Sequence, residues 1–304
     1  MVAIADIAAG STIVRERPFF VMPRTISANS EEEHLRIMNG LVDFLHPDNK
    51  RAFFALRNSK GHTTSSQVKG IMDTNAFIAG PFPTFPAKYA GVARDISRVN
   101  HSCNPNAMHS FETATLTHVL RAVHAIRAGE EVTVSYLNDQ LGMHDARQEE
   151  LCRRYLFKCK CKSCRLTGLA RTVSDVARMA INESAHPVCI MKDEAAFRVW
   201  LANGAVLGPS ARDANGEHPL VAAEATWSAM EQEGCYEVML WESVLLRLVR
   251  GYAALENEQA VRHYATKAAA LRMAETGEDG GWLAVAENPR KTEAWAGRGE
   301  KRKV

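Results

Sequence analysis

Hydrophobic and polar positions change their spacing several times along the first half of the chain, which predicts short strands interrupted by helices. Residues 2–7 and 12–15 are typical of two strands, and a turn ending in Gly10 joins them. Residues 27–62 have helical spacing instead. Ser30 is a suitable N-cap there, and the three glutamates that follow it favour the positive end of a helix dipole. The chain is therefore expected to begin with a strand pair and a helical insertion.

The next stretch of the chain mixes both periodicities. A second helix is predicted at about 48–58, and the glycines and prolines of 80–91 predict a loop. Short strands are predicted over 107–136, where β-branched residues alternate with polar ones. Residues 146–156 predict a helix that leads directly into a cluster of cysteines.

The character of the chain changes after about residue 168, where alanine, leucine and glutamate become frequent. Long helices are predicted at about 219–233, 236–255 and 257–275, and the last two are expected to form an antiparallel hairpin. Residues 282–299 predict a loop-rich tail. The basic end, GEKRKV, is expected to be a solvated terminus, with a nuclear-import signal as the alternative.

Composition limits the classes of protein to be considered. The chain has 304 residues, which favours two domains or one large domain with an appendage. The formal net charge of +2 is too small to indicate nucleic-acid binding by itself. No apolar run approaches the roughly 18 residues that a membrane span requires. The amino terminus has no basic region before its apolar residues, so we expect no secretory signal and a cytoplasmic or nuclear location.

The segment CKCKSC brings three of the seven cysteines, Cys159, Cys161 and Cys164, within six positions. In a reducing compartment such cysteines are metal ligands or reactive thiols and not a disulfide framework. A structural zinc site is tetrahedral and needs a fourth ligand. From the residues alone, the candidates for that ligand are Cys103, Cys152, Cys189, Cys235 and the eleven histidines.

Lysines and arginines surround the cysteine cluster, and residues 147–165 contain seven of them against two glutamates. Cations lower thiol pKa values and balance the charge of metal-bound thiolates, so they fit a zinc site. An unstructured basic linker and a nucleic-acid patch are the alternatives. The patch is disfavoured because only Tyr155 and Phe157 could offer stacking surfaces within it.

Three motifs occur in a recognisable order: NHSCNPN at 100–106, GEEVTVSY at 129–136 and YLFKCKCKSC at 155–164. Together they resemble the SET-domain protein lysine methyltransferases, and the spacing is most similar to the SET-and-MYND type. IADIAAGSTIVRERP at 4–18 also resembles the opening strand pair of that family, and GIMDTNAFIAG at 70–80 resembles the segment that leads out of its helical insert. The insert contains no cysteine, so no MYND zinc finger is expected.

The resemblance implies an α+β chain with the SET β-clip fold of short strands. It implies a SET domain at 1–137 with a helical insert at about 27–90, a zinc-bound post-SET segment at 138–167 and a helical region at 168–304. The partner it implies is a protein or peptide lysine. We expect a monomer with no membrane partner, and nucleic acid only as the weaker alternative through residues 147–165.

The resemblance also implies roles for individual residues. Tyr136 is the expected methyl-transfer tyrosine. The S-adenosylmethionine pocket is expected to include Asn75, Asn100, His101, Tyr136 and Phe157, and the lysine channel Tyr155 and Phe157. One structural zinc ion is expected on Cys103, Cys159, Cys161 and Cys164.

One feature of the family is missing from the expected position. A Gly-x-Gly element normally precedes the opening strand, and the sequence begins at Met1-Val2-Ala3, just past that element. The expected function is S-adenosylmethionine-dependent methyl transfer to a protein lysine. The alternative is a catalytically silent SET-fold interaction module, and a third hypothesis is a zinc-stabilised nucleic-acid binder.

Overall fold

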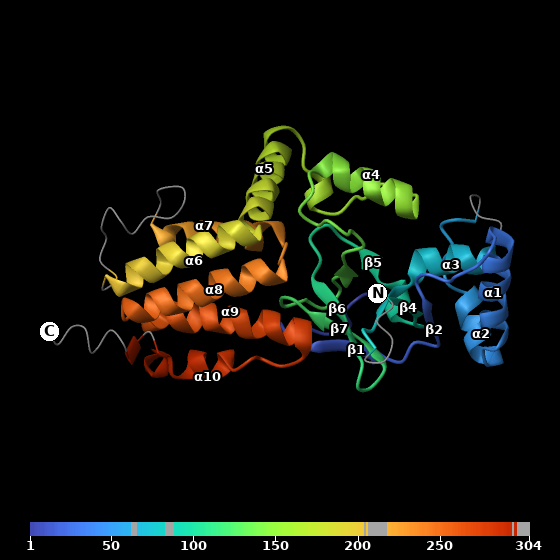
Figure 1. The fold of residues 1–304 in the computed structure, drawn as a ribbon, viewed down its shortest axis with the longest axis horizontal. Coiled ribbons are helices and arrows are strands. Elements are labelled where there is room, and N and C mark those ends of the chain that lie inside the picture. Colours follow the sequence, from blue (N-terminus) through green and yellow to red (C-terminus); the bar gives the residue numbers. More distant parts are fainter. Residues whose placement is uncertain (62–65, 83–87, 204, 206–217, 294, 297–304) are drawn as a thin grey trace. The chain divides into compact units, whose positions relative to one another are not determined.

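The computed structural model describes residues 1–61, 66–82, 88–203, 205, 218–293 and 295–296 (Figure 1). Helices and small sheets are combined, which confirms the α+β prediction. The chain divides into two compact units. The N-terminal unit consists of Met1–Leu137 and Gln148–Cys159, and the C-terminal unit consists of Asn138–Arg147 and Lys160–Val304.

The N-terminal unit contains three small sheets. Two are antiparallel, in the orders β1-β7-β6 and β2-β4-β3, and the third is a parallel pair, β5-β8. Its strands are β1 (Thr12–Glu16), β2 (Phe20–Pro23), β3 (Phe77–Ala79), β4 (Tyr89–Val92), β5 (Asn100–His101), β6 (Ala107–Glu112), β7 (Thr117–Ala122) and β8 (Thr133–Val134).

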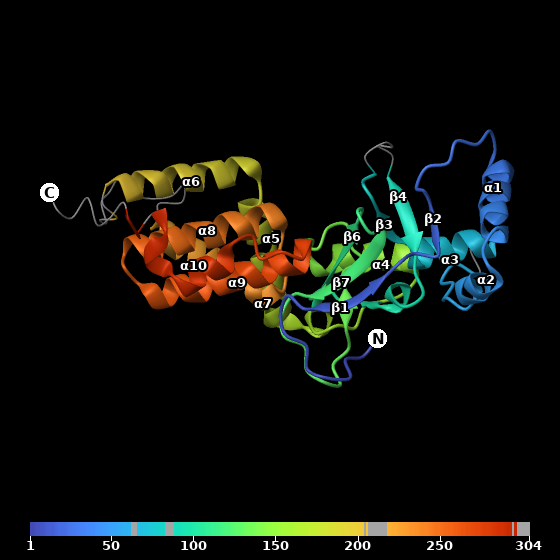
Figure 2. The ribbon, with the colours of Figure 1, turned by 90° about the horizontal axis from the view of Figure 1, so that it is seen from below.

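Strand β7 is the central strand of its sheet, with β1 on one side and β6 on the other (Figure 2). All six of its residues are buried, because both edges are paired and both faces are covered. Leu120 and Ala122 belong to a core that also contains Ile96, Val99 and Val134. Val99 comes directly before β5 and Val134 belongs to β8, so this core holds both short strands in place.

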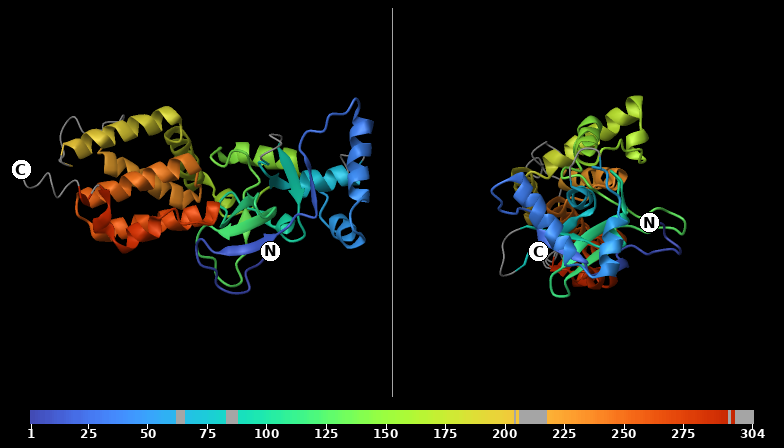
Figure 3. Two further views of the ribbon diagram at one scale, coloured as in Figure 1. Left: turned by 60° about the horizontal axis from the view of Figure 1, so that its bottom comes forward. Right: turned by 90° about the vertical axis from the view of Figure 1, so that its right-hand side faces the viewer.

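A second core lies between the β2-β4-β3 sheet and three helices of the insert (Figure 3). These helices are α1 (Glu31–Asp43), α2 (Pro47–Phe54) and α3 (Gln67–Asn75). The predicted cap is confirmed, since Ser30 Oγ accepts a hydrogen bond of 3.1 Å from the backbone N–H of Glu33. The predicted second helix is shorter than expected and ends at Phe54, and α3 was not predicted.

Two local predictions for the N-terminal unit are wrong. Residues 2–7 form no strand and make only two isolated bridges, from Val2 to Glu131 and from Ile7 to Ile126. The reason is that the opposite segment contains a turn at Arg127–Glu130, so Ala3 bonds to turn residues instead of a strand. The loop predicted at 80–91 ends earlier, because β4 begins at Tyr89, and residues 83–87 lie outside the described part.

The C-terminal unit is helical. The three long predicted helices are confirmed as α7, α8 and α9, which pack side by side (Figure 1). Helix α4 (His144–Tyr155) was also predicted, and its residues are shared between the two units. The helices of this unit are α5 (Gly168–Ser184), α6 (Pro187–Ala202), α7 (Pro219–Glu233), α8 (Val238–Ala254), α9 (Glu258–Thr276) and α10 (Trp282–Glu287).

Helix α10 corrects the prediction of a loop-rich tail after residue 281. Trp282 and Val285 pack against a core formed by α8 and α9, and this burial stabilises a helix of only six residues. Residues 297–304, which include the basic end, lie outside the described part. Among the described helices, none combines the length and the apolar composition needed to cross a membrane.

A fully buried arginine, Arg178 on α5, connects four segments of the C-terminal unit. Its Nε donates to Glu233 Oε2 at 2.8 Å, and its Nη1 donates to Gln140 O at 2.6 Å and to Cys235 Sγ at 2.9 Å. Its Nη2 donates to Glu233 O at 3.2 Å and to Ser163 Oγ at 3.4 Å. The five N–H donors of the guanidinium are thus all engaged, which is the condition for burying its charge.

Replacing Arg178 by methionine should destabilise the C-terminal unit by about 3–5 kcal/mol, because Glu233 would keep a buried charge without its partner. Urea unfolding followed by helical circular dichroism measures this change. The double variant Arg178→Met/Glu233→Gln should recover part of the loss. The control Arg198→Met removes an exposed partner of Glu194 on α6, and it should change stability by less than about 1 kcal/mol.

Two histidines form a buried pair in the β6-β7 hairpin. His109 Nε2 lies 2.7 Å from His118 Nδ1, and the His109 ring packs on Phe77 with centroids 4.6 Å apart. Burial lowers the pKa of His109 to about 3 and that of His118 to about 4. Gly91 of β4 faces His118 and leaves room for its ring, since a Cβ at this position would lie 2.5 Å from His118 Nε2.

This pair should make the stability of the N-terminal unit depend on pH. Both histidines have folded-state pKa values below their ordinary value of 6.5, so below that pH the unfolded chain binds more protons. The stabilisation is complete above about pH 6.5. It should be lost as the pH falls towards 4 for His118 and towards 3 for His109, at up to about 1.4 kcal/mol per pH unit for each histidine.

The measurement is urea unfolding at pH 7, 6 and 5. The double variant His109→Leu/His118→Leu should lose most of the excess slope between pH 6 and 5, whereas His124→Gln, at an exposed site, should keep the wild-type slope. Equal slopes in all three proteins would contradict the assignment to the buried pair.

Candidate active site and metal centre

The parallel pairing of β5 with β8 brings two of the sequence motifs together. Asn100 is opposite Thr133, and His101 is opposite Val134. The backbone N–H of Ser102 continues the ladder with a bond of 3.0 Å to Val134 O. The NHSCNPN and GEEVTVSY motifs, which are separated by a hairpin in the sequence, therefore lie side by side.

Tyr136, the predicted methyl-transfer residue, lies two positions after β8. Its hydroxyl donates to the carbonyl oxygen of Val99, and its backbone N–H donates to His101 Nδ1 at 3.0 Å. Its ring lies 5.4 Å from the His101 ring and 4.9 Å from the Tyr155 ring, measured between centroids. Burial raises the pKa of Tyr136 and, to a smaller extent, that of Tyr155. Both phenols are consequently protonated at neutral pH.

Phe157 completes this aromatic cluster. It is half-buried, and its ring lies 6.2 Å from that of His101. The structure thus brings together four of the predicted site residues, namely His101, Tyr136, Tyr155 and Phe157. We refer to these four residues as the aromatic cluster.

The remaining two predicted residues lie differently. Asn100 is exposed, and its amide donates to Glu131 Oε1 at 2.7 Å. Asn75 is buried at the end of α3, where its amide nitrogen donates to Ile71 O at 2.8 Å and to Arg57 O at 2.6 Å. Its contacts are with the helical insert and not with the aromatic cluster, so its cofactor role stays a prediction.

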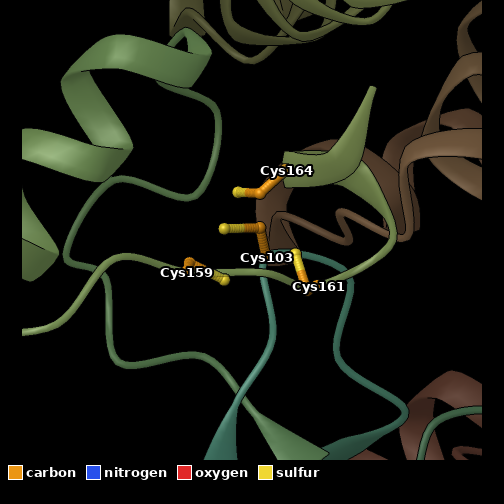
Figure 4. A group of neighbouring side chains, drawn as sticks. All are labelled: Cys103, Cys159, Cys161 and Cys164. Atoms are coloured by element: carbon orange, nitrogen blue, oxygen red, sulfur yellow. The ribbon is translucent and has the colours of Figure 1, made fainter. Parts of the chain in front are cut away.

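The four predicted zinc ligands lie together (Figure 4). The sulfur atoms of Cys103, Cys159, Cys161 and Cys164 are all within 4.8 Å of one another. Cys103 follows β5, whereas the other three belong to the segment after α4. All except Cys161 are buried. Among the described residues, this is the one group of metal-ligating side chains that is close enough to hold an ion.

The donor set fits zinc. A tetrahedron with Zn–S bonds of about 2.3 Å has edges of about 3.8 Å, which the four sulfur atoms can reach with small adjustments. A hydrogen-bond donor also faces the cluster, since His101 Nε2 lies 3.2 Å from Cys103 Sγ. Gln148 of α4 fixes the backbone of Cys159, because its amide donates to Cys159 O and accepts from Cys159 N, both at 3.0 Å. Supporting contacts of this kind are typical of structural metal sites.

Comparison with known proteins identifies the domain that carries the NHSCNPN and GEEVTVSY motifs. The family model described as SET domain matches residues 1–137.

Residues 1–137 form a SET domain.

The relatives of the chain carry names that agree with this domain. The histone-lysine N-methyltransferase set5 of Schizosaccharomyces pombe is 27% identical over 212 residues, which cover 65% of this chain and 58% of the relative. SMYD3 of Mus musculus, also named a histone-lysine N-methyltransferase, is 42% identical over 74 residues, or 24% of this chain and 17% of the relative. ASHR1 of Arabidopsis thaliana, with the same activity in its name, is 34% identical over 94 residues, or 31% and 19%. The chain thus matches 58% or less of the length of these relatives.

The predicted resemblance to SET-domain lysine methyltransferases is confirmed by this match.

The structure also adds residues that were not predicted. Asn106, the last residue of NHSCNPN, holds the segment before β8. Its amide donates to Glu131 O at 2.8 Å, and its Oδ1 accepts from Thr133 N at 2.8 Å. The signal in the motif is the side-chain amide of this third asparagine, which can donate and accept hydrogen bonds at the same time.

From α4, Arg154 supports Tyr136 of the SET domain and the last residue of the same helix, Tyr155. Its Nη1 donates to Tyr136 O at 3.2 Å and to Glu150 Oε1 at 2.6 Å, and its Nη2 donates to the Tyr155 hydroxyl at 3.3 Å. The Glu150–Arg154 spacing of four is a helical ion-pair signal. The same contacts weaken the nucleic-acid alternative, because Arg154 is engaged within the protein and Arg147 is buried.

Glu16 was also not predicted to be important. Its carboxylate accepts from Asp95 N at 3.0 Å and from the backbone N–H of Ile96, at the start of the 3-10 helix Ile96–Arg98. This contact caps the short helix that immediately precedes Val99. Glu16 therefore stabilises the position of the carbonyl group to which Tyr136 donates its hydroxyl hydrogen.

We expect the purified chain to contain about one zinc ion, bound by the four cysteines. Cys103→Ser should reduce the zinc content well below one per chain, because it removes the ligand that comes from a separate part of the sequence. Elemental analysis and release of zinc to a chelator measure this change. Cys189→Ser on α6 is the matched control and should keep the wild-type content. Full zinc retention by Cys103→Ser would contradict the ligand set.

Proposed function

We propose that this protein is an S-adenosylmethionine-dependent protein-lysine methyltransferase. The observation that carries the proposal is the position of Tyr136 in the SET domain, anchored at three points. These anchors are the hydroxyl on Val99 O, the backbone N–H on His101 Nδ1 and the carbonyl on Arg154 Nη1. Together these contacts hold the backbone and the ring of Tyr136 in one orientation beside His101 and Tyr155.

S-adenosylmethionine would supply an electrophilic methyl group on a sulfonium. Methyl transfer from such a donor is a single displacement, so the protein acts mainly by alignment and electrostatics. Asn100, His101, Tyr136 and Phe157 are the residues we assign to the cofactor, and Tyr155 and Phe157 are those we assign to the lysine channel. Asn75 is retained in the cofactor set only through the family resemblance.

The lysine amine must be neutral to attack, which costs roughly 4 kcal/mol at neutral pH from an ordinary pKa of about 10.4. Tyr136 and Tyr155 cannot supply a base for this step, because burial raises both pKa values. Their rings, together with Phe157, instead form a poorly solvated surface. Such a surface favours the uncharged amine, since burial disfavours the charged form. We infer that the aromatic cluster lowers the pKa of the incoming lysine and does not abstract its proton.

Zinc on the four cysteines would be structural in this scheme, and no chemical step requires it. Phe157 lies two residues before Cys159, and Gln148 holds the backbone of Cys159 on α4. A metal bound to both Cys103 and Cys159 would therefore keep Phe157 beside His101, with which it is in ring contact. We propose that the segment around residues 155–164 is a zinc-dependent wall of the β-clip active site.

The proposed substrate class is a lysine side chain of a protein. The names of the relatives, which include histone-lysine methyltransferases from a yeast, a mouse and a plant, favour histones as the first substrates to test.

Replacing Tyr136 by phenylalanine removes the hydroxyl that anchors the ring to Val99 O, and it should lower kcat for methyl transfer by about 10²-fold, comparable to a misplacement of about 1 Å. The ring remains, so binding of S-adenosylmethionine in calorimetry should change little. The assay is transfer of a labelled methyl group to a mixture of histones. Tyr252→Phe in the C-terminal unit removes a hydroxyl that bonds Glu224 and should leave kcat unchanged.

Two results would contradict the proposal. Failure of the wild-type chain to bind S-adenosylmethionine would favour the catalytically silent interaction module. Wild-type kcat in Tyr136→Phe would show that methyl transfer, if present, does not use this tyrosine.

A further inference from the structure

We propose that His101 is a positioning residue that couples the cysteine metal site to Tyr136. The part of this inference that concerns methyl transfer rests on the function proposed above. The hydrogen bonds themselves do not. The imidazole lies between the two groups, with Nδ1 accepting from Tyr136 N at 3.0 Å and Nε2 at 3.2 Å from Cys103 Sγ.

The backbone contact determines the tautomer of His101. A peptide N–H can only donate, so Nδ1 must present a lone pair to Tyr136. The ring hydrogen of the neutral imidazole is then on Nε2, because the hydrogen bond of one ring nitrogen determines the state of the other. The contact with Cys103 is therefore an N–H···S hydrogen bond in which His101 donates.

The acceptor favours a metal-bound thiolate. The His101 ring is buried, so its N–H requires an acceptor, and a thiolate is a far better one than a neutral thiol. Zinc binding deprotonates its cysteine ligands and thereby strengthens this bond. In return, the donated hydrogen bond disperses part of the negative charge on Cys103. Metal binding and the orientation of His101 thus support each other, and such coupling must be reciprocal.

Tyr136 is sensitive to this ring because little else holds its backbone N–H. Strand β8 contains only Thr133 and Val134, so Tyr136 lies beyond the ladder. Its hydroxyl and carbonyl have their own anchors on Val99 and Arg154. The N–H anchor on His101 is the one that leads to the cysteine site. Rotation of the imidazole after metal loss would break the hydrogen bond from the Tyr136 N–H to His101 Nδ1.

The same geometry excludes another role for the side chain. One ring nitrogen is committed to Tyr136 and the other to Cys103, so neither is directed at a lysine amine. His101 cannot act as a general base without breaking both contacts. The assignment of His101 to the cofactor pocket therefore concerns its backbone and ring face and not its nitrogens.

The first test uses the wild-type protein with ¹⁵N-labelled histidine, with zinc bound and after chelation. The zinc-bound form should show a His101 resonance pattern typical of the Nε2–H tautomer, and the backbone amide resonance of Tyr136 should shift when zinc is removed. A Nδ1–H tautomer, or a Tyr136 amide that is unaffected by zinc removal, would overturn the proposal. This experiment needs no substrate and no variant.

The second test compares His101→Leu with His101→Gln. A glutamine can accept with its oxygen and donate with its nitrogen, whereas leucine can do neither. We expect His101→Leu to release zinc to a chelator at least tenfold faster, within the 10- to 100-fold range typical of supporting residues around metals. It should also lower kcat by a similar factor, with a smaller change in KM for S-adenosylmethionine. His101→Gln should recover most of both losses, and His124→Leu should behave as wild type.

Zinc release at the wild-type rate from His101→Leu would overturn the coupling, as would loss of kcat that glutamine does not restore. If no lysine substrate is methylated by the wild-type chain, the proposed function fails. The coupling is then still decided by the zinc-release rates and the resonance shifts, because both are measured without methyl transfer.

Discussion

The active-site region depends on a parallel ladder between two strands of only two residues each. Parallel strands cannot be joined by a tight turn, so the chain must cross over between Asn100–His101 and Thr133–Val134. Here the β6-β7 hairpin makes that crossover, and its burial provides the free energy that the short ladder lacks. Without the ladder, His101 and Tyr136 would not meet. Side chains of Asn100 and Asn106 reinforce the start of the ladder through Glu131 and Thr133.

Local features of the chain could be predicted because their causes are local. Ser30 caps α1 through a residue three positions away, and α7, α8 and α9 follow from apolar spacing within each helix. The zinc ligands could be proposed because three of them are within six residues, although the fourth required the family resemblance. Tyr136, His101 and Tyr155 were likewise recognised from motifs, and the structure places them in contact.

The features that were missed depend on partners remote in sequence. Glu16 caps a helix that begins 80 residues later, and Gln148 reaches the backbone of Cys159 eleven residues away. Polar side chains on a helix surface give no sign of such partners. Helix α10 packs on α8 and α9, whereas the flanking Gly280, Gly281 and Pro289 favoured a loop in the sequence. The prediction of a strand at 2–7 was wrong because the segment opposite these residues is a turn.

The polar groups of the aromatic cluster already make hydrogen bonds within the protein. These hydrogen bonds limit the possible chemistry more than the residue types do. Tyr136 donates its hydroxyl hydrogen to Val99 O, Tyr155 is held by Arg154, and both ring nitrogens of His101 are engaged. A cluster of this kind offers rings and fixed dipoles but no ready proton acceptor. It therefore suits a reaction that needs a desolvated, aligned nucleophile and an electrophile that is already activated. Methyl transfer from a sulfonium to an amine has these requirements, whereas hydrolysis or acyl transfer would require a base that Tyr136, Tyr155 and His101 do not provide.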